Sequence, residues 1–422
     1  MPNYNYPSDW AVLSIKELTA EFLNGGTPST HIKEFWGGNI PWITGADAEQ
    51  KVTTISRKSI TELGVKQSST NVVPKNNILL VTRTGVGKVS ISGVDVAISQ
   101  DLTGLIPKSD LVDIEYLYYQ LIQLSPALIG LTQGSIIQGV QREEVEALTI
   151  PVPALSEQRK IAEILSTLDD AIAQTEALIR KQERVKQGLM SDLLTRGVDE
   201  NGEVRPSADE RPELYKHSQF GNIPKVWDVT SCSSICYEIV VGIVIRPTQY
   251  YVTDGIPALR SKNIKKNGIN GDDLVFISSK SNQLLTKSML RTGNVVTVRT
   301  GEPGTSCVIP DSYDGANCID LIISRPKPMM DSDFLALWIN SSFGRNQVLE
   351  NQGGLAQQHF NVGHMKQLQV VLPKIEEQQI ITHILNSHQE LIEQERALKN
   401  KLQSLKRGLM QDLLSGAVRV KE

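Results

Sequence analysis

The sequence lacks the features that mark membrane, secreted and disulfide-bonded proteins. Its longest apolar run, IVVGIVI at residues 239–245, is far too short to span a bilayer. The opening stretch MPNYNYPSDW has neither the basic region nor the apolar segment of a signal peptide. The cysteines all lie in the second half, without the paired Cys-x-x-Cys spacing of a zinc or redox site, at Cys232, Cys236, Cys307 and Cys318. We therefore expect a cytoplasmic protein with reduced thiols and no membrane contact.

Catalytic motifs are also scarce. The most enzyme-like stretch, VTRTGVGKVS at 81–90, fails as a Walker A loop, because Thr82 replaces the first glycine and Val89 replaces the hydroxyl residue after Lys88. The chain has no Pro-Pro dipeptide, which the Pro-Pro-aromatic motif of an adenine methyltransferase would require. Its 6 histidines form no recognisable triad or metal set. The sequence thus predicts no catalytic residue, no metal and no cofactor.

Length and composition describe an ordinary globular chain. At 422 residues it is long enough for two or more domains, each with its own core. A hydrophobic content of 40% and a charged content of 21% are typical of soluble domains. The net charge of -4 gives no overall sign of nucleic-acid binding, so any such site has to be sought locally.

The second half of the chain repeats the first. Arg83-Thr84-Gly85 returns as Arg299-Thr300-Gly301, and Ile40-Pro41 returns as Ile256-Pro257. Further counterparts are Pro7 and Pro224, Trp10 and Trp227, and Asp101-Leu102 and Asp320-Leu321. The offset drifts only between about 216 and 220 residues, as expected when insertions are confined to loops. We interpret the pattern as a tandem duplication.

The most similar segments of the two copies are residues 156–194 and 376–414, which align without a gap with roughly four positions in ten identical. Both are predicted to be long helices of about 55 to 60 Å. Gly188 and Gly408 lie inside them, where glycine is unfavourable, so we expect a close approach to another helix or a break before a short terminal helix. Gly197 has the position of a helix C-cap.

Apolar residues repeat along these helices. Every seventh position is apolar in the second helix, at Ile384, Leu391, Leu398 and Leu405, interleaved with Ile381, Leu402 and Leu409, and the first helix matches with Ile164, Ala171, Leu178 and Val185. This spacing predicts one apolar seam on each helix. We favour pairing of the two helices, because the seam outruns one small domain; the alternative is that each seam packs on its own domain. Candidates for partner contacts are Leu178, Val185, Leu189, Leu391, Leu398, Leu405 and Leu409.

The segments before the helices are mostly strand-like. Runs such as NILLVTRTG and NVVTVRTG are short, β-branched and bounded by glycine, which predicts small mixed sheets. One amphipathic helix is expected in each copy, around residues 111–124 and 331–343. The predicted fold class is α+β, a duplicated globule followed each time by a long helix. The expected boundaries are a first globule at 1–153, a helix at 154–197, a connector at 198–215, a second globule at 216–373 and a helix at 374–417.

One nuclease-like pattern leaves an enzymatic alternative open. A carboxylate stands two residues before a lysine at Glu49-Gln50-Lys51, as restriction-type nucleases require. The corresponding region of the second copy, RSKNIKKNG, has no carboxylate at that position. A magnesium-dependent nuclease that acts alone through Asp47, Glu49 and Lys51 is therefore the alternative to a binding protein.

Several markers in a fixed order resemble the specificity subunits of Type I restriction-modification systems. They are FGNIPKVW with its partner PSDWAV, the GGTPST segment, the helix openings VPALSEQRKIAEIL and LPKIEEQQIITHIL, and the GLM-x-DLL helix ends. Each marker is weak by itself, but their order along nearly the whole chain is specific. GGTPST has no clear counterpart, since the second copy reads VGIVIRP there, which fits two domains with different targets.

The resemblance implies a fold and a set of partners. The two globules would be target recognition domains, and the two helices would pair in antiparallel as a coiled coil. Each domain would read one half of a split site in double-stranded DNA. Methyltransferase subunits, two in number, would bind the helical region, and motor-nuclease subunits would join for cleavage. The chain itself would be a DNA reader and not a catalyst.

Basic residues gather locally near the repeated turns. Lysine and arginine outnumber acidic residues between 259 and 300, which favours contact with phosphates there. In the Arg-Thr-Gly turns, glycine permits close backbone approach, threonine can bond phosphate and arginine can fork to guanine. The alternative is a tight hairpin whose arginine pairs with a nearby carboxylate. The candidates are Arg83, Thr84, Gly85, Lys88, Arg260, Lys262, Arg299, Thr300 and Gly301.

Two amide-rich turns are further candidates. GSIIQGV contains Gln138, and GGLAQQHFNV contains Gln357 and Asn361. Glutamine and asparagine can read adenine edges in the major groove. The alternative is an amide-rich surface loop without a ligand.

Overall fold

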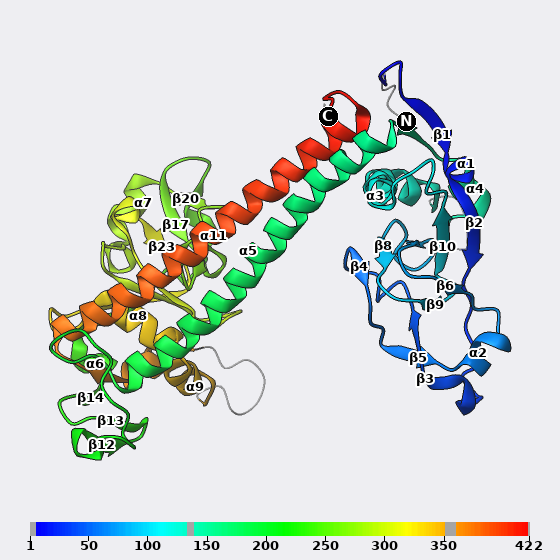
Figure 1. Ribbon diagram of the computed structural model, residues 1–422. Helices are drawn as coiled ribbons and strands as arrows, with labels where there is room; N and C mark the ends of the chain where they lie inside the picture. The colour runs from blue at the N-terminus through cyan, green and yellow to red at the C-terminus, as the bar shows by residue number, and fades with distance from the viewer. Residues whose placement is uncertain (1–5, 133–138, 351–359, 421–422) are drawn as a thin grey trace. The chain divides into compact units, whose positions relative to one another are not determined.

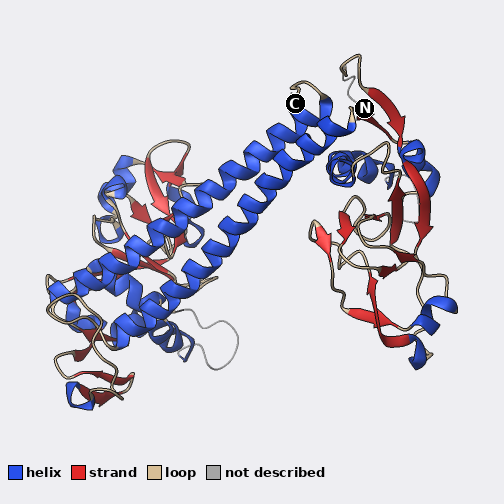
Figure 2. Ribbon diagram, in the orientation of Figure 1, coloured by secondary structure: helices blue, strands red, loops and turns tan. Residues whose placement is uncertain are grey.

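The structure is a computed structural model that describes residues 6–132, 139–350 and 360–420 (Figures 1 and 2). The chain divides into two compact units. Unit 1 comprises Met1–Ala177 and Arg396–Glu422, and unit 2 comprises Leu178–Glu395. Within the described ranges, no helix is long and apolar enough to cross a membrane.

Unit 1 contains two mixed sheets, a separate strand pair and one longer helix, α3 (Ile114–Leu131). The strand pair is β1 (Ala11–Ser14) with β11 (Thr149–Val152). One sheet has the order β2 (Thr19–Asn24), β10 (Leu102–Pro107), β7 (Ile78–Val81), β8 (Val89–Ser92) and β4 (Val52–Thr53). The other has the order β5 (Lys58–Ile60), β3 (Trp36–Ile43), β9 (Val96–Ile98) and β6 (Val72–Val73). Short helices are α1 (Ile15–Leu18), α2 (Glu62–Lys66) and α4 (Arg142–Ala147).

The elements of unit 1 follow local signals. Every residue of β7 and β8 is buried, as their β-branched runs predict. The α3 helix begins after Asp113, whose carboxylate accepts hydrogen bonds from the Glu115 and Tyr116 N–H groups at 3.0 and 3.1 Å. It continues beyond the expected end and past Pro126, because Leu128 is buried in the core of the unit.

Unit 2 repeats this arrangement. Its strand pair is β14 (Asp228–Ser231) with β25 (Gln369–Leu372). One sheet has the order β15 (Cys236–Val241), β24 (Leu321–Pro326), β21 (Val295–Val298) and β22 (Ser306–Val308). The other has the order β16 (Tyr251–Val252), β20 (Val275–Ile277), β17 (Ile256–Leu259) and β23 (Asn317–Cys318). Two hairpins are β12 (Tyr215–Ser218) with β13 (Gly221–Pro224), and β18 (Ile264–Lys265) with β19 (Gly268–Ile269). Short helices are α6 (Cys232–Ile235), α7 (Ser279–Leu284) and α10 (Val362–Gln367).

The helix expected around 331–343 is two helices, α8 (Ser332–Asn340) and α9 (Ser342–Glu350). They are separated at Ser341, whose backbone is extended and whose hydroxyl donates to the Trp338 carbonyl at 2.6 Å. Gly344 lies close to that turn, since a Cβ at this position would be 2.4 Å from the Trp338 carbonyl oxygen. The tight turn at Ser341 interrupts the helix, and the apolar periodicity of the sequence does not predict this interruption.

The sheet topologies confirm the tandem duplication of an α+β domain. The order β2-β10-β7-β8 in unit 1 corresponds to β15-β24-β21-β22 in unit 2. The parallel pair β3 and β9 corresponds to the parallel pair β17 and β23. Edge strands differ in both sheets. In the first sheet, β4 of unit 1 pairs with β8, whereas β18 of unit 2 pairs with β19. In the other sheet, the fourth strand is β6 beside β9 in unit 1 but β16 beside β20 in unit 2.

The long helices α5 (Leu155–Thr195) and α11 (Ile375–Ser415) pair in antiparallel, as expected. In unit 1, Lys399 of α11 bonds Glu176 of α5 at 3.0 Å, and Lys406 pairs with Asp169, which lies earlier in α5. In unit 2, Lys186 donates to Gln389 at 2.6 Å. As the residue number rises along α5, the number of its partner in α11 falls, which is the pattern of antiparallel helices.

The expected seam is only partly correct. Leu391, Leu398 and Leu405, at every seventh position, are about half exposed, whereas the interleaved Ile381 is buried as expected, together with Leu385 and Ile392. The buried side of α11 also carries the half-buried Lys399 and Lys406, which bond α5. Polar residues thus occupy seam positions, and the leucines at every seventh position lie on another face.

The break expected at the helical glycines is wrong, and no described residue of this chain approaches either glycine closely. The helices run unbroken through Gly188 and Gly408, and a Cβ at either position would meet nothing within 4 Å. The C-cap at Gly197 is confirmed: it has a φ of 63°, and its N–H donates to the Leu193 carbonyl at 3.2 Å. Gly416 ends α11 in the same way, with a φ of 74°.

Each long helix begins with a buried glutamate that holds an arginine from the segment after the other helix. Arg419 bonds Glu157 with two nitrogens at 2.8 and 2.9 Å in unit 1. Arg205 bonds Glu377 at 2.5 and 3.2 Å in unit 2. Arg205 belongs to the expected connector, which is therefore fastened to the start of α11. Charge-assisted bonds with two contacts fix geometry strongly, so each arginine ties one helix end to the opposite helix start.

The glutamine that follows each glutamate fastens the start of the neighbouring helix. Gln158 accepts the Asp113 N–H at 2.8 Å and donates to Leu111 and Pro153 carbonyls at 3.0 and 2.8 Å. Gln378 repeats all three bonds with Asp331, Met329 and Pro373 at 2.8, 3.0 and 2.8 Å. The Glu-Gln pair shared by the two helix openings thus has a structural role.

Two adjacent residues of α11 test the observed seam. Ile392→Ala removes a side chain that is 2% exposed and should lower the free energy of unfolding by about 2–5 kcal/mol. Leu391→Ala, at a site 49% exposed, should change it by about 0.5 kcal/mol or less. Urea unfolding followed by far-ultraviolet circular dichroism measures both. Equal losses would contradict the observed seam.

Candidate nucleic-acid interface

The two Arg-Thr-Gly segments occupy equivalent hairpin turns. One joins β7 to β8, and the other joins β21 to β22. Gly85 and Gly301 have φ values of 93° and 89°, which a residue with a Cβ adopts at a cost. The Gly87 N–H donates to the Val81 carbonyl at 3.1 Å, and Gly304 repeats the bond at 3.0 Å. The glycines therefore serve the shape of the turn.

An aspartate holds each turn from the neighbouring strand. Thr84 donates its hydroxyl to Asp101 at 3.2 Å, and Thr300 donates to Asp320 at 3.2 Å. Because each hydroxyl proton is used within the protein, the threonines are less suited to bind phosphate than the sequence suggested. The repeated Asp-Leu pair was the sequence signal for these two aspartates, but sequence reasoning did not place them at the site.

The arginines of the two turns differ. Arg83 is exposed, and the described residues offer it no ion-pair partner. Arg299 pairs with Asp320, and its Nε donates to the Phe360 carbonyl at 3.4 Å. Its side chain is 18% exposed. Arg299 thus has the contacts of the hairpin alternative, while Arg83 is exposed and pairs with no acidic side chain in the described part of the chain.

The segment GGTPST makes a backbone hydrogen bond in unit 1 that has an equivalent in unit 2. The Gly25 N–H donates to the Leu102 carbonyl at 3.3 Å, and the Gly242 N–H donates to the Leu321 carbonyl at 2.8 Å. A Cβ on Gly25 would lie 1.8 Å from the Ser99 carbonyl oxygen, so the chain requires glycine there. Gly242 of VGIVIRP is therefore the structural counterpart of Gly25 of GGTPST, although the residues that follow differ.

The other basic candidates have acidic neighbours. Lys88 pairs with Glu49 at 3.6 Å, and both side chains are largely exposed. Arg260 lies 3.6 Å from Asp273, which also pairs with Lys262. The exposed Lys88–Glu49 pair is weak in water, so a phosphate could compete for Lys88. Arg260 is held more firmly, because its side chain is 26% exposed and also donates to the Asp273 carbonyl.

The amide candidates are only partly described. Gln138 and Gln357 lie outside the described residues. Asn361 is the N-cap of α10, where its side-chain oxygen accepts the His364 N–H at 3.0 Å. This bond gives Asn361 a structural function and leaves its amide nitrogen facing His364 at 3.5 Å.

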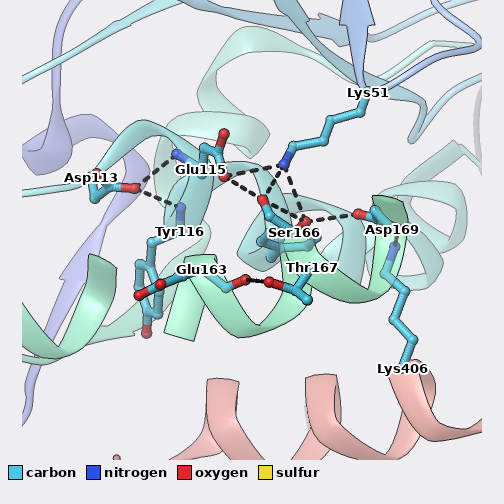
Figure 3. A network of polar contacts seen from close by, with 10 residues as sticks. Lys51, Asp113, Glu115, Tyr116, Glu163, Ser166, Thr167, Asp169 and Lys406 are labelled. Atoms are coloured by element: carbon cyan, nitrogen blue, oxygen red, sulfur yellow. Dashed lines mark hydrogen bonds and ion pairs between the residues drawn. The ribbon is translucent and has the colours of Figure 1, made fainter. Parts of the chain in front are cut away.

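The residues of the nuclease alternative do not converge. Asp47 accepts the Thr44 N–H and hydroxyl at 2.9 and 2.6 Å. Glu49 pairs with Lys88, whereas Lys51 points into a cluster of α3 and α5 side chains (Figure 3). No group of three acidic, histidine or cysteine side chains among the described residues could hold a metal ion. The arrangement therefore gives the nuclease alternative no support.

The cysteines are buried and unpaired. Burial raises the pKa of Cys236 and of Cys307 to about 12, so both thiols stay protonated at neutral pH. Burial also raises the pKa of Cys232 and Cys318. These thiols pack as small apolar groups.

Comparison with known proteins identifies related sequences. The family model described as Type I restriction modification DNA specificity domain matches residues 7–184 and 249–404. The Type I restriction enzyme MjaIX specificity subunit of Methanocaldococcus jannaschii is 27% identical over 99% of this chain and 95% of its own length. The EcoR124I/EcoR124II specificity subunit of Escherichia coli is 33% identical over 39% of this chain and 45% of its own length.

Solved structures share the fold. The S subunit of a Type I restriction-modification system from M. genitalium has a TM-score of 0.59 at 14% identity, over 98% of each chain. A chain from a structure on complex assembly and conformational transition of the type I R-M system has a TM-score of 0.56 at 15% identity, over 98% of this chain and 100% of that one. At such identities the likeness concerns the arrangement of the chain.

Proposed function

The chain belongs to the family of Type I restriction-modification DNA specificity domains, and from this we propose that each unit reads one half of a bipartite site in double-stranded DNA. The chain is the specificity subunit of such a system. The observation that supports the proposal most strongly is the duplication itself. Both units present the same sheet, the same turn and the same aspartate support, while the exposed residues around the turns differ. Equal scaffolds with unequal surfaces suit two readers of different sequences.

We assign the parts of the chain to this role as follows. Residues 1–153 and 216–373 are the two target recognition domains, 154–197 and 374–417 are the helical regions, and 198–215 is the connector. The helical regions carry methyltransferase subunits, and motor-nuclease subunits join the complete complex. The specificity subunit performs no reaction itself and acts in the cytoplasm, with the DNA that it reads.

Arg83 is our first candidate for base reading. It is exposed beside the tight turn at Gly85, and no carboxylate among the described residues pairs with it. An arginine in such a position can donate two hydrogen bonds to guanine. Arg299 is already bonded to Asp320 and therefore belongs to the support of its turn.

The two arginines should respond differently to replacement. Arg83→Ala should weaken recognition of the first half-site by about 1–3 kcal/mol and leave thermal stability unchanged. Arg299→Ala should lower the melting temperature, because it leaves Asp320 without its cation. Methylation rates on targets with single-base changes in each half, together with thermal unfolding, measure both effects.

The wild-type complex, assayed on the same target set, is the reference. A uniform loss of affinity for all sequences in Arg83→Ala would make Arg83 a phosphate contact. The absence of any loss would remove it from the interface. A single undivided target for the wild-type complex would contradict the two-reader proposal itself.

The exposed apolar residues at the seventh positions form two equivalent pairs, which we call the exposed strips. In unit 1, Leu398 and Leu405 of α11 are 45 and 51% exposed. In unit 2, Leu178 and Val185 of α5 are 38 and 40% exposed. Large apolar side chains aligned on one helix face are typical of a surface that another helix covers.

A glycine extends each strip by almost one turn. Gly408 follows Leu405 and Gly188 follows Val185 by three residues, so each lies on the same helix face. A Cβ at either glycine would meet nothing within 4 Å, which leaves room for a close approach from outside. We propose that each strip binds one methyltransferase subunit, so that two equivalent strips bind two. Leu189 and Leu409 instead pack partly against the cores of units 2 and 1.

Charged replacements should separate partner binding from folding. Leu398→Lys with Leu405→Lys should weaken binding of one methyltransferase subunit by about 2 kcal/mol or more per residue. Leu178→Lys with Val185→Lys should release the other subunit. The melting temperature of the isolated chain should stay unchanged, because these side chains lie outside the seam. Native mass spectrometry counts the bound subunits, and retention of two subunits by the fourfold variant would refute the assignment.

A further inference from the structure

We propose that Lys51 is a positioning residue that fixes the first recognition domain on the helix pair and thereby restricts the DNA spacer that the complex accepts. The proposal rests on the proposed function, because it concerns the distance between the two half-sites. Its basis is a cluster in unit 1 that joins the recognition sheet to α3, α5 and α11.

Lys51 is the centre of this cluster (Figure 3). Its Nζ lies 3.1 Å from a Glu115 carboxylate oxygen and 2.5 Å from the Ser166 hydroxyl. It also lies 3.3 Å from the Tyr119 hydroxyl. Glu115 and Tyr119 belong to α3, and Ser166 belongs to α5. One ammonium group from the recognition domain therefore contacts two helices.

The cluster continues to the second long helix. The Tyr119 hydroxyl donates to Asp169 of α5 at 2.7 Å, and Asp169 pairs with Lys406 of α11. Burial raises the pKa of Tyr119, so the hydroxyl remains a proton donor at neutral pH. Contacts thus link Lys51 to α11 without interruption.

On its other side, Lys51 is bonded to the strand after the Arg83 turn. The Ile91 N–H donates to the Lys51 carbonyl at 2.8 Å, and the Ser90 hydroxyl donates to the Gln50 carbonyl at 2.8 Å. Glu49 pairs with Lys88 inside the turn region at 3.6 Å. A single short segment therefore connects the candidate DNA-reading turn to the helices.

The charges of the cluster balance. Lys51 and Lys406 face the carboxylates of Glu115 and Asp169. The side chains of Lys51, Asp169 and Lys406 are 22, 24 and 20% exposed, so water screens them less than a surface pair, whereas Glu115 is 41% exposed. A partly buried network of this kind has strong geometric preferences, because each member satisfies another.

Unit 2 has a different attachment. The positions of α8 that correspond to Glu115 and Tyr119 are Leu335 and Ile339, both buried in the apolar core. The pair Asp169–Lys406 corresponds to Gln389 and Lys186, joined by a hydrogen bond of 2.6 Å. The role proposed for Lys51 is therefore specific to the first recognition domain.

The test uses the complete methyltransferase complex and targets whose two halves are separated by the native spacer or by one base pair more or less. Lys51→Met should reduce the preference for the native spacer roughly fivefold, because the domain is held less firmly. Base preference within each half should remain that of the wild type. A residue that merely stabilised the fold would lower all methylation rates without altering spacer preference.

Two further variants complete the design. Lys75→Met alters an exposed lysine elsewhere in unit 1 and should behave as the wild type. The exchanged pair Lys51→Glu with Glu115→Lys should recover a large part of the spacer preference. If Lys51→Met fails to fold, Tyr119→Phe removes only the hydroxyl that joins Lys51 to Asp169 and should loosen the spacer in the same direction.

The outcomes separate the two proposals. Unchanged spacer preference in folded Lys51→Met and Tyr119→Phe would overturn the positioning role, and so would a change in base preference, which would make Lys51 a DNA contact. A wild-type complex that shows no bipartite target would overturn the proposed function instead. The target of the wild-type complex is therefore determined before the variants are compared.

Discussion

The antiparallel pairing of α5 and α11 is the constraint on which the other features depend. Each of these 41-residue helices begins in one unit and ends in the other, so neither unit has a complete helix pair from its own half of the sequence. The buried Glu157 and Glu377 reinforce the pairing, because each binds an arginine from beyond the end of the opposite helix. Each unit therefore contains parts of both copies of the repeat.

The seam of this pair is not uniformly apolar, and that has a functional consequence. Lysines 399 and 406 bond Glu176 and Asp169 across it, and polar groups at such positions favour one register over others. The apolar heptad residues are left on an exposed face. A single sequence pattern thus serves two surfaces: polar pairs align the two helices, and the heptad leucines lie on the exposed face, where we propose that a partner binds.

The sequence was sufficient to predict the duplication, the fold class and the two long helices, because these depend on repeated patterns over many residues. The antiparallel pairing was expected from the family resemblance. The sequence was insufficient for the phase of the seam, since periodicity alone treats Leu398 as buried and Lys399 as exposed. The break at Ser341 was missed because it depends on a tight turn against Trp338. Such features arise from contacts between a few specific atoms.

The candidate site shows the same division. The two Arg-Thr-Gly turns were found as repeats, but their identical sequences did not predict that the two arginines have different neighbours. Arg299 meets Asp320, whereas Arg83 meets no carboxylate among the described residues, although Asp101 occupies the corresponding position. The roles of Gln158, Gln378 and Lys51 could not be predicted, because their partners are distant in sequence.

We propose that the paired helices set the distance between the two recognition domains. The most direct measurement is a map of methylated adenines for a variant with seven residues inserted in α5 before Lys181 and seven in α11 before Glu395. One heptad in each helix preserves the seam and adds about 10 Å, or roughly three base pairs. The account predicts unchanged half-site sequences separated by a spacer about three base pairs longer. An unchanged spacer, or altered bases in either half, would contradict it.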